Sequence, residues 1–491
     1  MSHGKAVAKN AIWLMAATAA QKVIAFITFT LIARWAGVQT MGQFFFAVSI
    51  TSVFVILTDL GMTPVVIREM AGDRERGMAA LKRALLTKIG LIPVAIICSL
   101  IYAYHSSAAS APIIFAAVAL ACFVMSADAV SLVWYGAIRG ERQLRYEALG
   151  MFFGQVLTAV ASVLSIRVFH TGLLGLVFSL FVGSAWNVVW SILSARRIGI
   201  TLDTPVLAVR PFFLSAVPFA LAGIFVKIYS YVDTQLLNFY HGITAVGYYA
   251  VAYKLTYAFQ FLPMTFVAAL YPGMSAAYAS KERAGLQQLL FGSLRLMVLI
   301  SVPIAALLSA LAPLYLPMVY GASYQPSIIP MQILAWVLIP IFLDFPIGSL
   351  LNATHRAGKK TIAMGITMIA NVIANVSLVP HYGPTGAAIS GVISFAILFL
   401  VGFWFVRRDF AHLRAPLGLF VRAAVATLAI WFVARTYLVH LPLMPAAILS
   451  LLLCFIVLFA TGLFSVQDVQ LVLRWMKKEP APIKETSHED P

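Results

Sequence analysis

Long apolar runs separated by short polar turns make up nearly the whole chain. Each run is roughly 20 residues long, the length that crosses the hydrocarbon core of a bilayer as an α-helix. We count about fourteen such runs. They lie at 11–33, 41–61, 84–104, 112–136, 147–168, 172–195, 211–238, 245–272, 290–312, 327–353, 360–379, 384–406, 418–436 and 443–464. The pattern predicts an all-α polytopic membrane protein with about 14 transmembrane helices.

Composition supports this prediction. Hydrophobic residues make up 62% of the chain and charged residues only 10%, with a mean hydropathy of +0.94. A water-soluble domain normally has a charged share near a quarter, so the bilayer must serve as solvent here. The first run carries Gln21 and Lys22 at its centre and has no small-residue cleavage site, which predicts a retained helix rather than a signal peptide.

The formal net charge of +17 is explained by topology rather than by nucleic-acid binding. With the N-terminus inside the cell, 28 of the 34 lysines and arginines fall in cytoplasmic segments. The other six are Arg34, Arg167 and Arg435 outside, and Lys22, Lys227 and Lys254 within the runs. This positive-inside distribution predicts a multi-pass protein of the bacterial inner (cytoplasmic) membrane with both termini in the cytoplasm.

The first half of the chain is repeated in the second half. Gly37 and Gly242 are separated by 205 positions, as are Gly42 and Gly247. A second match, offset by 211 positions, opens the sixth and twelfth runs: Gly172, Gly175 and Ser179 against Gly383, Gly386 and Ser390. The order of runs agrees at both places, so runs one to six correspond to runs seven to twelve.

The repeat predicts two six-helix bundles plus two C-terminal helices. Because six is even, equivalent helices run in the same direction, and a pseudo-two-fold axis along the membrane normal relates the bundles. The predicted division is 1–200 for the first bundle, 201–410 for the second, 411–465 for helices 13 and 14, and 466–491 for a cytoplasmic tail. Within the tail, 466–475 is short and amphipathic, which favours a segment lying on the membrane surface.

Two lysines occupy equivalent places in the repeat. Lys22 and Lys227 are each near the middle of a run and are separated by the same 205 positions as the glycines. A charge near the bilayer centre costs about 2.5–3.5 kcal/mol on insertion scales, so both should avoid lipid and face each other across the axis. Gln21 is adjacent to Lys22 and continues its polar stripe. Unpaired positive charge in a central cavity favours an anionic substrate.

Lys254 and Asp233 add two further charges to the second bundle. Lys254 contributes a third positive group to the predicted cavity, and Asp233 lies six positions after Lys227, where it neutralises that lysine in part or guards the outer end. The alternative is an internal ion pair among these three residues, with no role in binding.

A second pair of equivalent charges is Asp128 and Asp344, which lie 216 positions apart and each precede a basic turn. Together with Asp233, they are candidates for carboxylates that couple proton or sodium movement to alternating access. A role in packing against a neighbouring helix is an equally good interpretation. Asp59, at a helix end, is interpreted as a cap for the following turn.

Aromatic residues and prolines mark the second bundle. Tyr253 and Tyr257 flank Lys254 on one helical face and are candidates to stack on sugar rings, although packing or interface anchoring explains many such aromatics. Five prolines are expected to interrupt helices there and to form hinges. They are Pro218, Pro263, Pro272, Pro340 and Pro346.

An ordered set of short motifs resembles the bacterial oligosaccharide flippases, the polysaccharide-transporter branch of the multidrug, oligosaccharidyl-lipid and polysaccharide exporter superfamily. In the first bundle the matching residues are Ala33, Arg34, Trp35, Ala36, Gly37 and Gly42, then Asp59, Leu60, Gly61 and Met62, then Arg68, Glu69, Met70 and Ala71. In the second they are Pro218, Tyr229, Asp233, Leu236 and Leu237, then Tyr271 to Ser275, then Tyr320, Gly321 and Tyr324. The resemblance spans helices one to twelve.

The resemblance implies a two-lobed transporter rather than an enzyme. Its expected substrate is an undecaprenyl-pyrophosphate-linked oligosaccharide, a repeat unit of O-antigen, capsule or exopolysaccharide, moved from the cytoplasmic to the periplasmic leaflet. Expected partners are membrane lipids, a coupling proton or sodium ion, and the polysaccharide polymerase and chain-length machinery. The paired lysines supply a physical reason, because they lower the cost of bringing a pyrophosphate into a low-dielectric passage.

Three other functions were considered. A multidrug and toxin extrusion protein exports organic cations and should have an acidic cavity, whereas this one is basic. A membrane-embedded polymerase or acyltransferase needs catalytic groups on a sizeable loop, and the outer loops are short. The nine histidines form no cluster, so the sequence nominates no metal site, cofactor or catalytic residue. A non-transporting scaffold leaves the duplicated charges unexplained.

Overall fold

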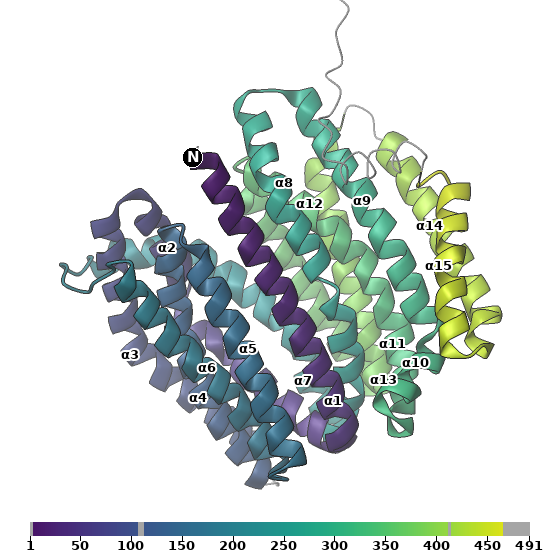
Figure 1. Ribbon diagram of the computed structural model, residues 1–491, viewed down its shortest axis with the longest axis horizontal. Helices are drawn as coiled ribbons and strands as arrows, with labels where there is room; N and C mark the ends of the chain where they lie inside the picture. The colour runs from purple at the N-terminus through teal and green to yellow at the C-terminus, as the bar shows by residue number, and fades with distance from the viewer. Residues whose placement is uncertain (1–2, 107–111, 411–413, 465–491) are drawn as a thin grey trace, which may run out of the picture.

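The computed structural model describes residues 3–106, 112–410 and 414–464 (Figure 1). Within these ranges the chain forms helices and turns, with no β-strand. The prediction of an all-α fold is therefore confirmed. The predicted surface segment at 466–475 and the rest of the tail lie outside the described residues.

The helices of the two halves form two groups that stand beside each other. In Figure 1, α2–α6 lie on one side and α8–α13 on the other, while α1 crosses in front between them. The first bundle comprises α1 (His3–Asp59), α2 (Met62–Gly72), α3 (Arg74–His105), α4 (Pro112–Gly140), α5 (Leu144–Arg167) and α6 (Gly172–Arg197). The second comprises α7 (Val209–Ala258), α8 (Phe261–Ala279), α9 (Arg283–Ala310), α10 (Ala312–Tyr320), η2 (Ala322–Ser327), α11 (Ile328–Leu334), η3 (Ala335–Val337), α12 (Leu338–Ala353), α13 (Ala357–Val406) and η4 (Arg407–Asp409).

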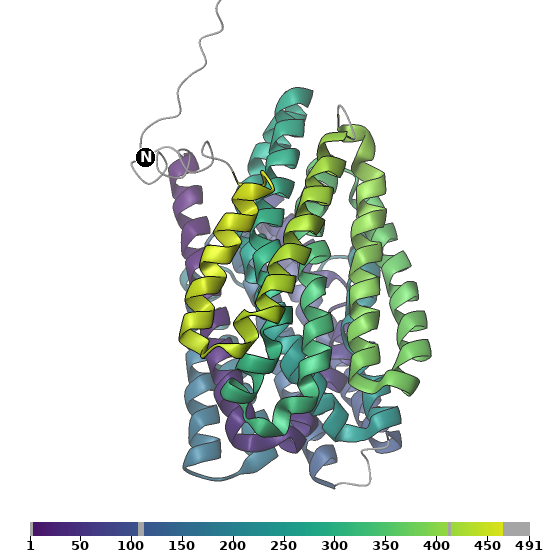
Figure 2. The ribbon, with the colours of Figure 1, turned by 90° about the vertical axis from the view of Figure 1, so that its right-hand side faces the viewer.

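The last helices flank the second bundle. They are α14 (Arg414–Thr436), η5 (Leu438–His440) and α15 (Leu443–Ala460), and Figure 2 shows α14 and α15 side by side on its outer face. The Trp431 indole of α14 donates a 3.2 Å hydrogen bond to the Ser309 hydroxyl of α9. Since a polar group in an apolar interface needs a partner, this bond fixes α14 against α9.

Eleven helical stretches among the described residues are long and apolar enough to cross a membrane. Three of them, with 42, 71 and 53 residues, are long enough for two crossings of roughly 20 residues each, and each contains a glycine with non-helical backbone angles. These glycines are Gly37 (φ 77°), Gly242 (φ 76°) and Gly383 (φ 52°). Each separates two predicted runs, because a left-handed φ reverses the chain at little cost only for glycine. The exact count of fourteen stays a prediction.

The two halves meet at a pair of equivalent glycines. A Cβ atom on Gly42 would lie 2.1 Å from the carbonyl oxygen of Ile243, and one on Gly247 would lie 2.2 Å from the carbonyl oxygen of Val38. Val38 and Ile243 are themselves 205 positions apart, so the contact is reciprocal. Only glycine permits backbones to approach this closely. The crossing therefore lies on the pseudo-two-fold axis that the repeat predicts.

The second sequence match has the same structural counterpart. Ser179 donates to the carbonyl of Gly175 at 2.7 Å, and Ser390 donates to the carbonyl of Gly386 at 2.9 Å. Gly172 and Gly383, which open the two helices, both have positive φ. The predicted equivalence of the sixth and twelfth helices is thus reproduced in local geometry.

Contacts between the halves also occur near the Gly37 kink. The Tyr324 hydroxyl of η2 donates a 3.0 Å hydrogen bond to the carbonyl of Ala33, and Arg34 donates to the carbonyl of Met318 at 3.0 Å. At the opposite end of the molecule, Gly61 packs against α7, where an added Cβ would lie 2.4 Å from the carbonyl oxygen of Ala216. The space between the bundles is therefore bounded by contacts at both ends.

The predicted proline interruptions are correct at two of five positions. Pro263 follows the break between α7 and α8, and Pro340 lies in the first turn of α12 directly after η3. In contrast, α7 continues through Pro218, α8 through Pro272 and α12 through Pro346. Transmembrane helices generally tolerate an internal proline, because other groups in the bundle can satisfy the freed carbonyl.

Candidate functional site

Two lysines from different bundles interact electrostatically. Lys22 of α1 and Lys254 of α7 belong to different bundles, and their positive charges act on each other. Both side chains are exposed. The Lys254 ammonium lies 5.5 Å from the centre of the Phe45 ring. A charge that is accessible and also coupled to the opposite bundle must face the space between the bundles. The structure thus brings together two of the three predicted lysines.

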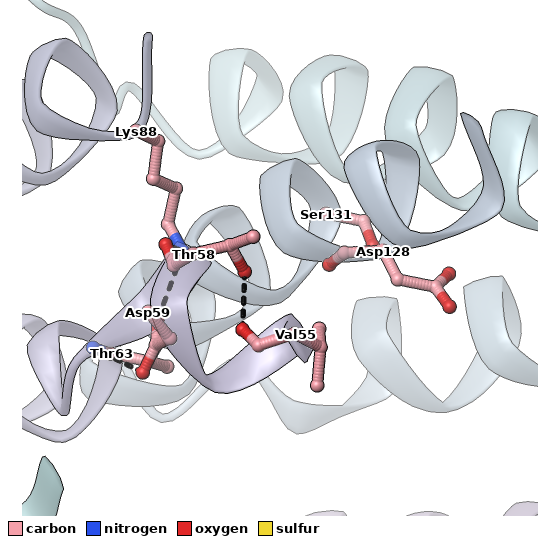
Figure 3. Close-up of polar contacts among 7 residues, drawn as sticks. All are labelled: Val55, Thr58, Asp59, Thr63, Lys88, Asp128 and Ser131. Carbon is pink, nitrogen blue, oxygen red and sulfur yellow. Dashed lines mark hydrogen bonds and ion pairs between the residues drawn. The ribbon is translucent and has the colours of Figure 1, made fainter. Parts of the chain in front are cut away.

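Lys227 has a different charged neighbour. It is coupled electrostatically to Asp128 of α4, in the first bundle, and its ammonium lies 5.5 Å from the centre of the Tyr231 ring. Asp128 is exposed and also lies next to the Ser184 hydroxyl. In Figure 3 its carboxyl group points away from the pair formed by Lys88 and Asp59. The attraction between Asp128 and Lys227 therefore spans the two bundles.

The repeat explains why the two duplicated lysines differ. In a symmetric arrangement, Lys227 would have as its neighbour the first-half counterpart of Lys254, which is Ser49. Ser49 carries no charge and accepts a 2.7 Å hydrogen bond from Gln235. Lys22 therefore has a second lysine as its neighbour, while Lys227 has a carboxylate. That Lys22 and Lys227 themselves face each other stays a prediction.

Two other predicted site residues are buried. Asp233 accepts hydrogen bonds from the Tyr249 hydroxyl and from the backbone N–H of Thr234, both at 2.6 Å. These bonds satisfy the carboxylate without either lysine, contrary to the alternative of an internal ion pair among Lys227, Lys254 and Asp233. The Oε1 atom of Gln21 is buried with no hydrogen-bond partner among the described residues.

A cavity of about 610 Å³ lies within the second bundle. Tyr253, Tyr257 and Asp344, three of the predicted site residues, line it. The rings of Tyr253 and Tyr257 stack with their centres 4.2 Å apart. Tyr253 also lies against Phe45, with ring centres 5.7 Å apart, so the cavity wall reaches the ring beneath Lys254.

The sequence did not identify the partner of Asp344. Lys360 of α13 donates a 2.5 Å hydrogen bond to Asp344 Oδ2, and both side chains line the cavity. Gly348 leaves room for this lysine, since an added Cβ would lie 3.0 Å from its Nζ. The sequence places Lys360 among the 28 cytoplasmic basic residues, because it begins a predicted run next to a basic turn. Its pairing with an acid 16 positions earlier is visible only once the helices are packed.

Lys88 is a second basic residue whose burial and partner the sequence did not identify. Its side chain is 2% exposed, and its ammonium donates to the carbonyl of Thr58 at 2.8 Å and to Asp59 Oδ1 at 3.0 Å. Asp59 also accepts the Thr63 hydroxyl, at 2.5 Å (Figure 3). The predicted cap is present as a long 3.4 Å bond from the Thr63 N–H, but the main partners of Asp59 are these two side chains.

The fold and this distribution of charge define a class: a multi-pass α-helical membrane protein of two homologous bundles with basic groups between them. Residues 7–278 match the family described as "Polysaccharide biosynthesis protein", and residues 218–380 match the MatE family. The first match covers more than half of the chain. The protein belongs to the polysaccharide biosynthesis protein family.

Known relatives agree with this assignment. The chain is 22% identical over 394 residues to "Probable low-salt glycan biosynthesis flippase Agl15" of Haloferax volcanii, an alignment that covers 80% of this chain and 81% of that protein. Among solved structures, it superimposes on "Lipid II flippase MurJ, inward closed conformation" with a TM-score of 0.70 at 16% identity, over 94% of this chain and 100% of the other. An inward-facing multidrug resistance MATE family transporter of the MOP superfamily gives a TM-score of 0.65 at 17% identity, over 79% and 94%. These superpositions identify the fold.

Proposed function

We propose that this protein is a flippase that moves a lipid-linked oligosaccharide across the membrane, with the anionic linkage bound between Lys22 and Lys254. The observation that carries the proposal is this pair of like charges contributed by the two bundles. Two ammonium groups repel each other in a low-dielectric space unless an anion lies between them. A pyrophosphate linkage supplies such an anion.

Net charge favours this substrate over an organic cation. Lys22, Lys227 and Lys254 contribute three positive charges to the space between the bundles, and Asp128 contributes one negative charge. The Asp233 carboxylate instead accepts hydrogen bonds from Tyr249 and Thr234. The MatE match and the likeness to a multidrug transporter leave cation export as the second candidate, but a net positive site repels cations.

The transport cycle proposed here is alternating access. The carrier is undecaprenyl pyrophosphate, and the glycan moves from the cytoplasmic to the periplasmic leaflet of the inner membrane. Both termini are cytoplasmic in this orientation, as the distribution of arginine and lysine predicts. The lipid tail stays in the bilayer, while the linkage and sugars pass between the bundles. Asp128 and Asp344 are the proposed coupling groups for a proton or a sodium ion.

The test is complementation of a flippase-null strain with Lys22→Ala/Lys254→Ala. Each charge-assisted hydrogen bond contributes roughly 1.5–3 kcal/mol, so losing two should lower transport about a hundredfold or more. Surface glycan is measured against protein abundance in the membrane. Lys22→Arg/Lys254→Arg should restore export because it restores the charge.

Lys359→Ala is the matched control, because Lys359 is an exposed lysine at the start of α13 and lies on the Phe405 ring rather than between the bundles. Normal surface glycan is expected from this variant. The proposal is wrong if the double alanine variant, present at normal abundance, exports as much glycan as the wild type.

A further inference from the structure

We propose that the cavity within the second bundle is a carbohydrate subsite that takes one neutral pyranose of the translocated glycan. This inference rests on the proposed function and assigns to that substrate a second contact, separate from the anion site between the bundles. The cavity volume of about 610 Å³ lies within the range of about 300–1,000 Å³ typical of small-molecule sites.

The cavity has aromatic walls from α7 and α13. Tyr257 stacks on Tyr253, and Phe395 of α13 lies against both Tyr257 and Tyr229, with ring centres 5.9 Å apart in each case. The face of an aromatic ring is negative, and the C–H groups on one face of a pyranose carry partial positive charge. These rings therefore offer stacking surfaces of the kind that sugar rings use.

Polar groups lie among the rings. Ser230, Gln260 and Asn352 line the cavity together with Asp344 and Lys360. Two atoms on the α12 wall, Asp344 Oδ1 and Ser349 Oγ, are buried with no hydrogen-bond partner among the described residues. Buried polar atoms in folded proteins normally have a partner. The hydroxyl groups of a guest can instead bond to Ser230, Gln260 and Asn352, which line the cavity.

The charge of the lining selects a neutral guest. Asp344 and Lys360 are the charged residues of the lining, and they form an ion pair with each other. A uronic acid would compete with Asp344 for Lys360, and an organic cation would compete with Lys360 for Asp344. Each would leave one partner of the pair uncompensated, which is costly in a partly buried site.

Helix breaks explain how the space arises. The helix stops at Ala258 and resumes at Phe261, so Gln260 lies in the gap and also lines the cavity. Pro263 favours this break, because it cannot donate to the carbonyl of Phe259. Discontinuous helices at membrane depth are tolerated where they line a cavity.

The position of the cavity suits a glycan attached to a bound anion. Tyr253 lines the cavity and lies against Phe45, and Lys254 lies over the same Phe45 ring. The first sugars after a pyrophosphate held by Lys254 are therefore adjacent to the cavity wall.

The experiment measures binding of free sugars to the full-length protein in lipid nanodiscs by saturation-transfer NMR and by titration. The probes are a neutral methyl hexoside, the matching methyl hexuronide and the tetraphenylphosphonium cation. The wild type should bind the hexoside best of the three. Tyr257→Ala should weaken hexoside binding about tenfold, from loss of the stacking surface. Asp344→Asn, which keeps the shape of the side chain, should narrow the difference between hexoside and hexuronide.

Tyr437→Ala is the matched control, since Tyr437 is an exposed tyrosine between α14 and η5, away from the cavity. It should bind the hexoside as the wild type does. The proposal is overturned if the wild type gives no saturation transfer to the hexoside. It is also overturned if tetraphenylphosphonium binds in preference, or if Tyr257→Ala and Asp344→Asn both bind like the wild type.

Failure of this inference and failure of the proposed function give different results. Lys22→Ala/Lys254→Ala should lose glycan export but keep binding of the free hexoside, because its cavity residues are unchanged. If export survives in that variant while Tyr257→Ala still loses hexoside binding, the anion site is wrong and the carbohydrate subsite stands.

Discussion

Each bundle holds a lysine and an aspartate in contact, but the two pairs have different surroundings. In the first bundle, Lys88 is 2% exposed and donates to both Asp59 and a backbone carbonyl, while Asp59 also accepts from Thr63. In the second bundle, the Lys360 and Asp344 side chains are 14% and 13% exposed beside a cavity, and Asp344 Oδ1 has no partner among the described residues.

The different surroundings of the two pairs indicate different roles. A buried ion pair is stable when further hydrogen bonds satisfy the remaining lone pairs and protons, as around Lys88 and Asp59. That pair ties the end of α1 to α3. The pair at Asp344 lines a cavity, and the single hydrogen bond that Lys360 makes within the described part of the chain goes to Asp344. The proposed sugar subsite therefore lies in the second bundle, although the folds of the two bundles are equivalent.

The largest expected effect is on the free energy of unfolding when the pair of Lys88 and Asp59 is broken. Lys88→Met removes both hydrogen bonds of a buried ammonium and leaves Asp59, whose side chain is 16% exposed, without its cation, which should lower the free energy of unfolding by about 3 kcal/mol. Denaturant unfolding of the detergent-solubilised protein, followed by tryptophan fluorescence, measures this loss.

Lys88→Met/Asp59→Asn is the control for that prediction. The asparagine has no charge but can still accept from Thr63, so most of the lost stability should return. If the double variant is as unstable as the single one, lost packing around Lys88 rather than unpaired charge explains the defect.

The second-largest effect is expected at Gly42 and Gly247, where the contacts of the two bundles are equivalent. Gly42→Ala and Gly247→Ala each place a Cβ about 2 Å from a backbone carbonyl of the other half, an atom that cannot move aside alone. Each should cost about 1–3 kcal/mol, and the two costs should match because the contacts are reciprocal. Thermal unfolding measures both. Gly90→Ala is the control, since nothing lies within 4 Å of its added Cβ. Unequal losses at Gly42 and Gly247 would show that the axis is not at this crossing.

The sequence predicts these symmetric features well because they depend on local chemistry. A positive φ combined with ψ near 180° is open almost only to glycine, so Gly37 (ψ 170°) and Gly242 (ψ 180°) mark equivalent kinks without knowledge of the packing. Apolar runs show which segments are helical, and all fourteen predicted runs begin and end within or beside observed helices. Pro263 likewise indicates the break after α7.

The sequence does not predict which charges meet. Lys88 and Lys360 lie at the start of predicted apolar runs, where hydropathy assigns lysine to the membrane surface, and their acids are 29 and 16 positions away on other helices. Helical periodicity gives a face but not the rotation of that face relative to its neighbours. The same limit applies to the walls of the cavity, where Phe395 joins tyrosines from α7.

A smaller effect is expected when the pair of Lys360 and Asp344 is broken. Lys360→Met removes the partner of Asp344, but the carboxylate lies beside a cavity that admits water, so the free energy of unfolding should fall by only about 1–2 kcal/mol. The same denaturant titration as for Lys88→Met gives a direct comparison of the two bundles. A loss equal to that of Lys88→Met would mean that the second pair is as structural as the first.

The smallest effect is expected at Lys227, where the repeat and the structure suggest different outcomes. By position it equals Lys22, so a symmetric site predicts equal losses of export for Lys22→Met and Lys227→Met. In the structure, Lys227 is partly neutralised by Asp128, and an accessible pair of this kind contributes about 0.2–1 kcal/mol. Lys227→Met should therefore lower glycan export less than about fivefold, and Lys22→Met tenfold or more.

The double variant Lys227→Met/Asp128→Asn decides between the two. Its export is compared with that of Asp128→Asn alone, because Asp128 is itself a proposed coupling group. The two variants should export equally if Lys227 serves mainly to balance Asp128. If the double variant exports less than Asp128→Asn, and Lys22→Met and Lys227→Met are equally impaired, Lys227 contacts the substrate as Lys22 does. The anion would then lie on the pseudo-two-fold axis rather than beside Lys254.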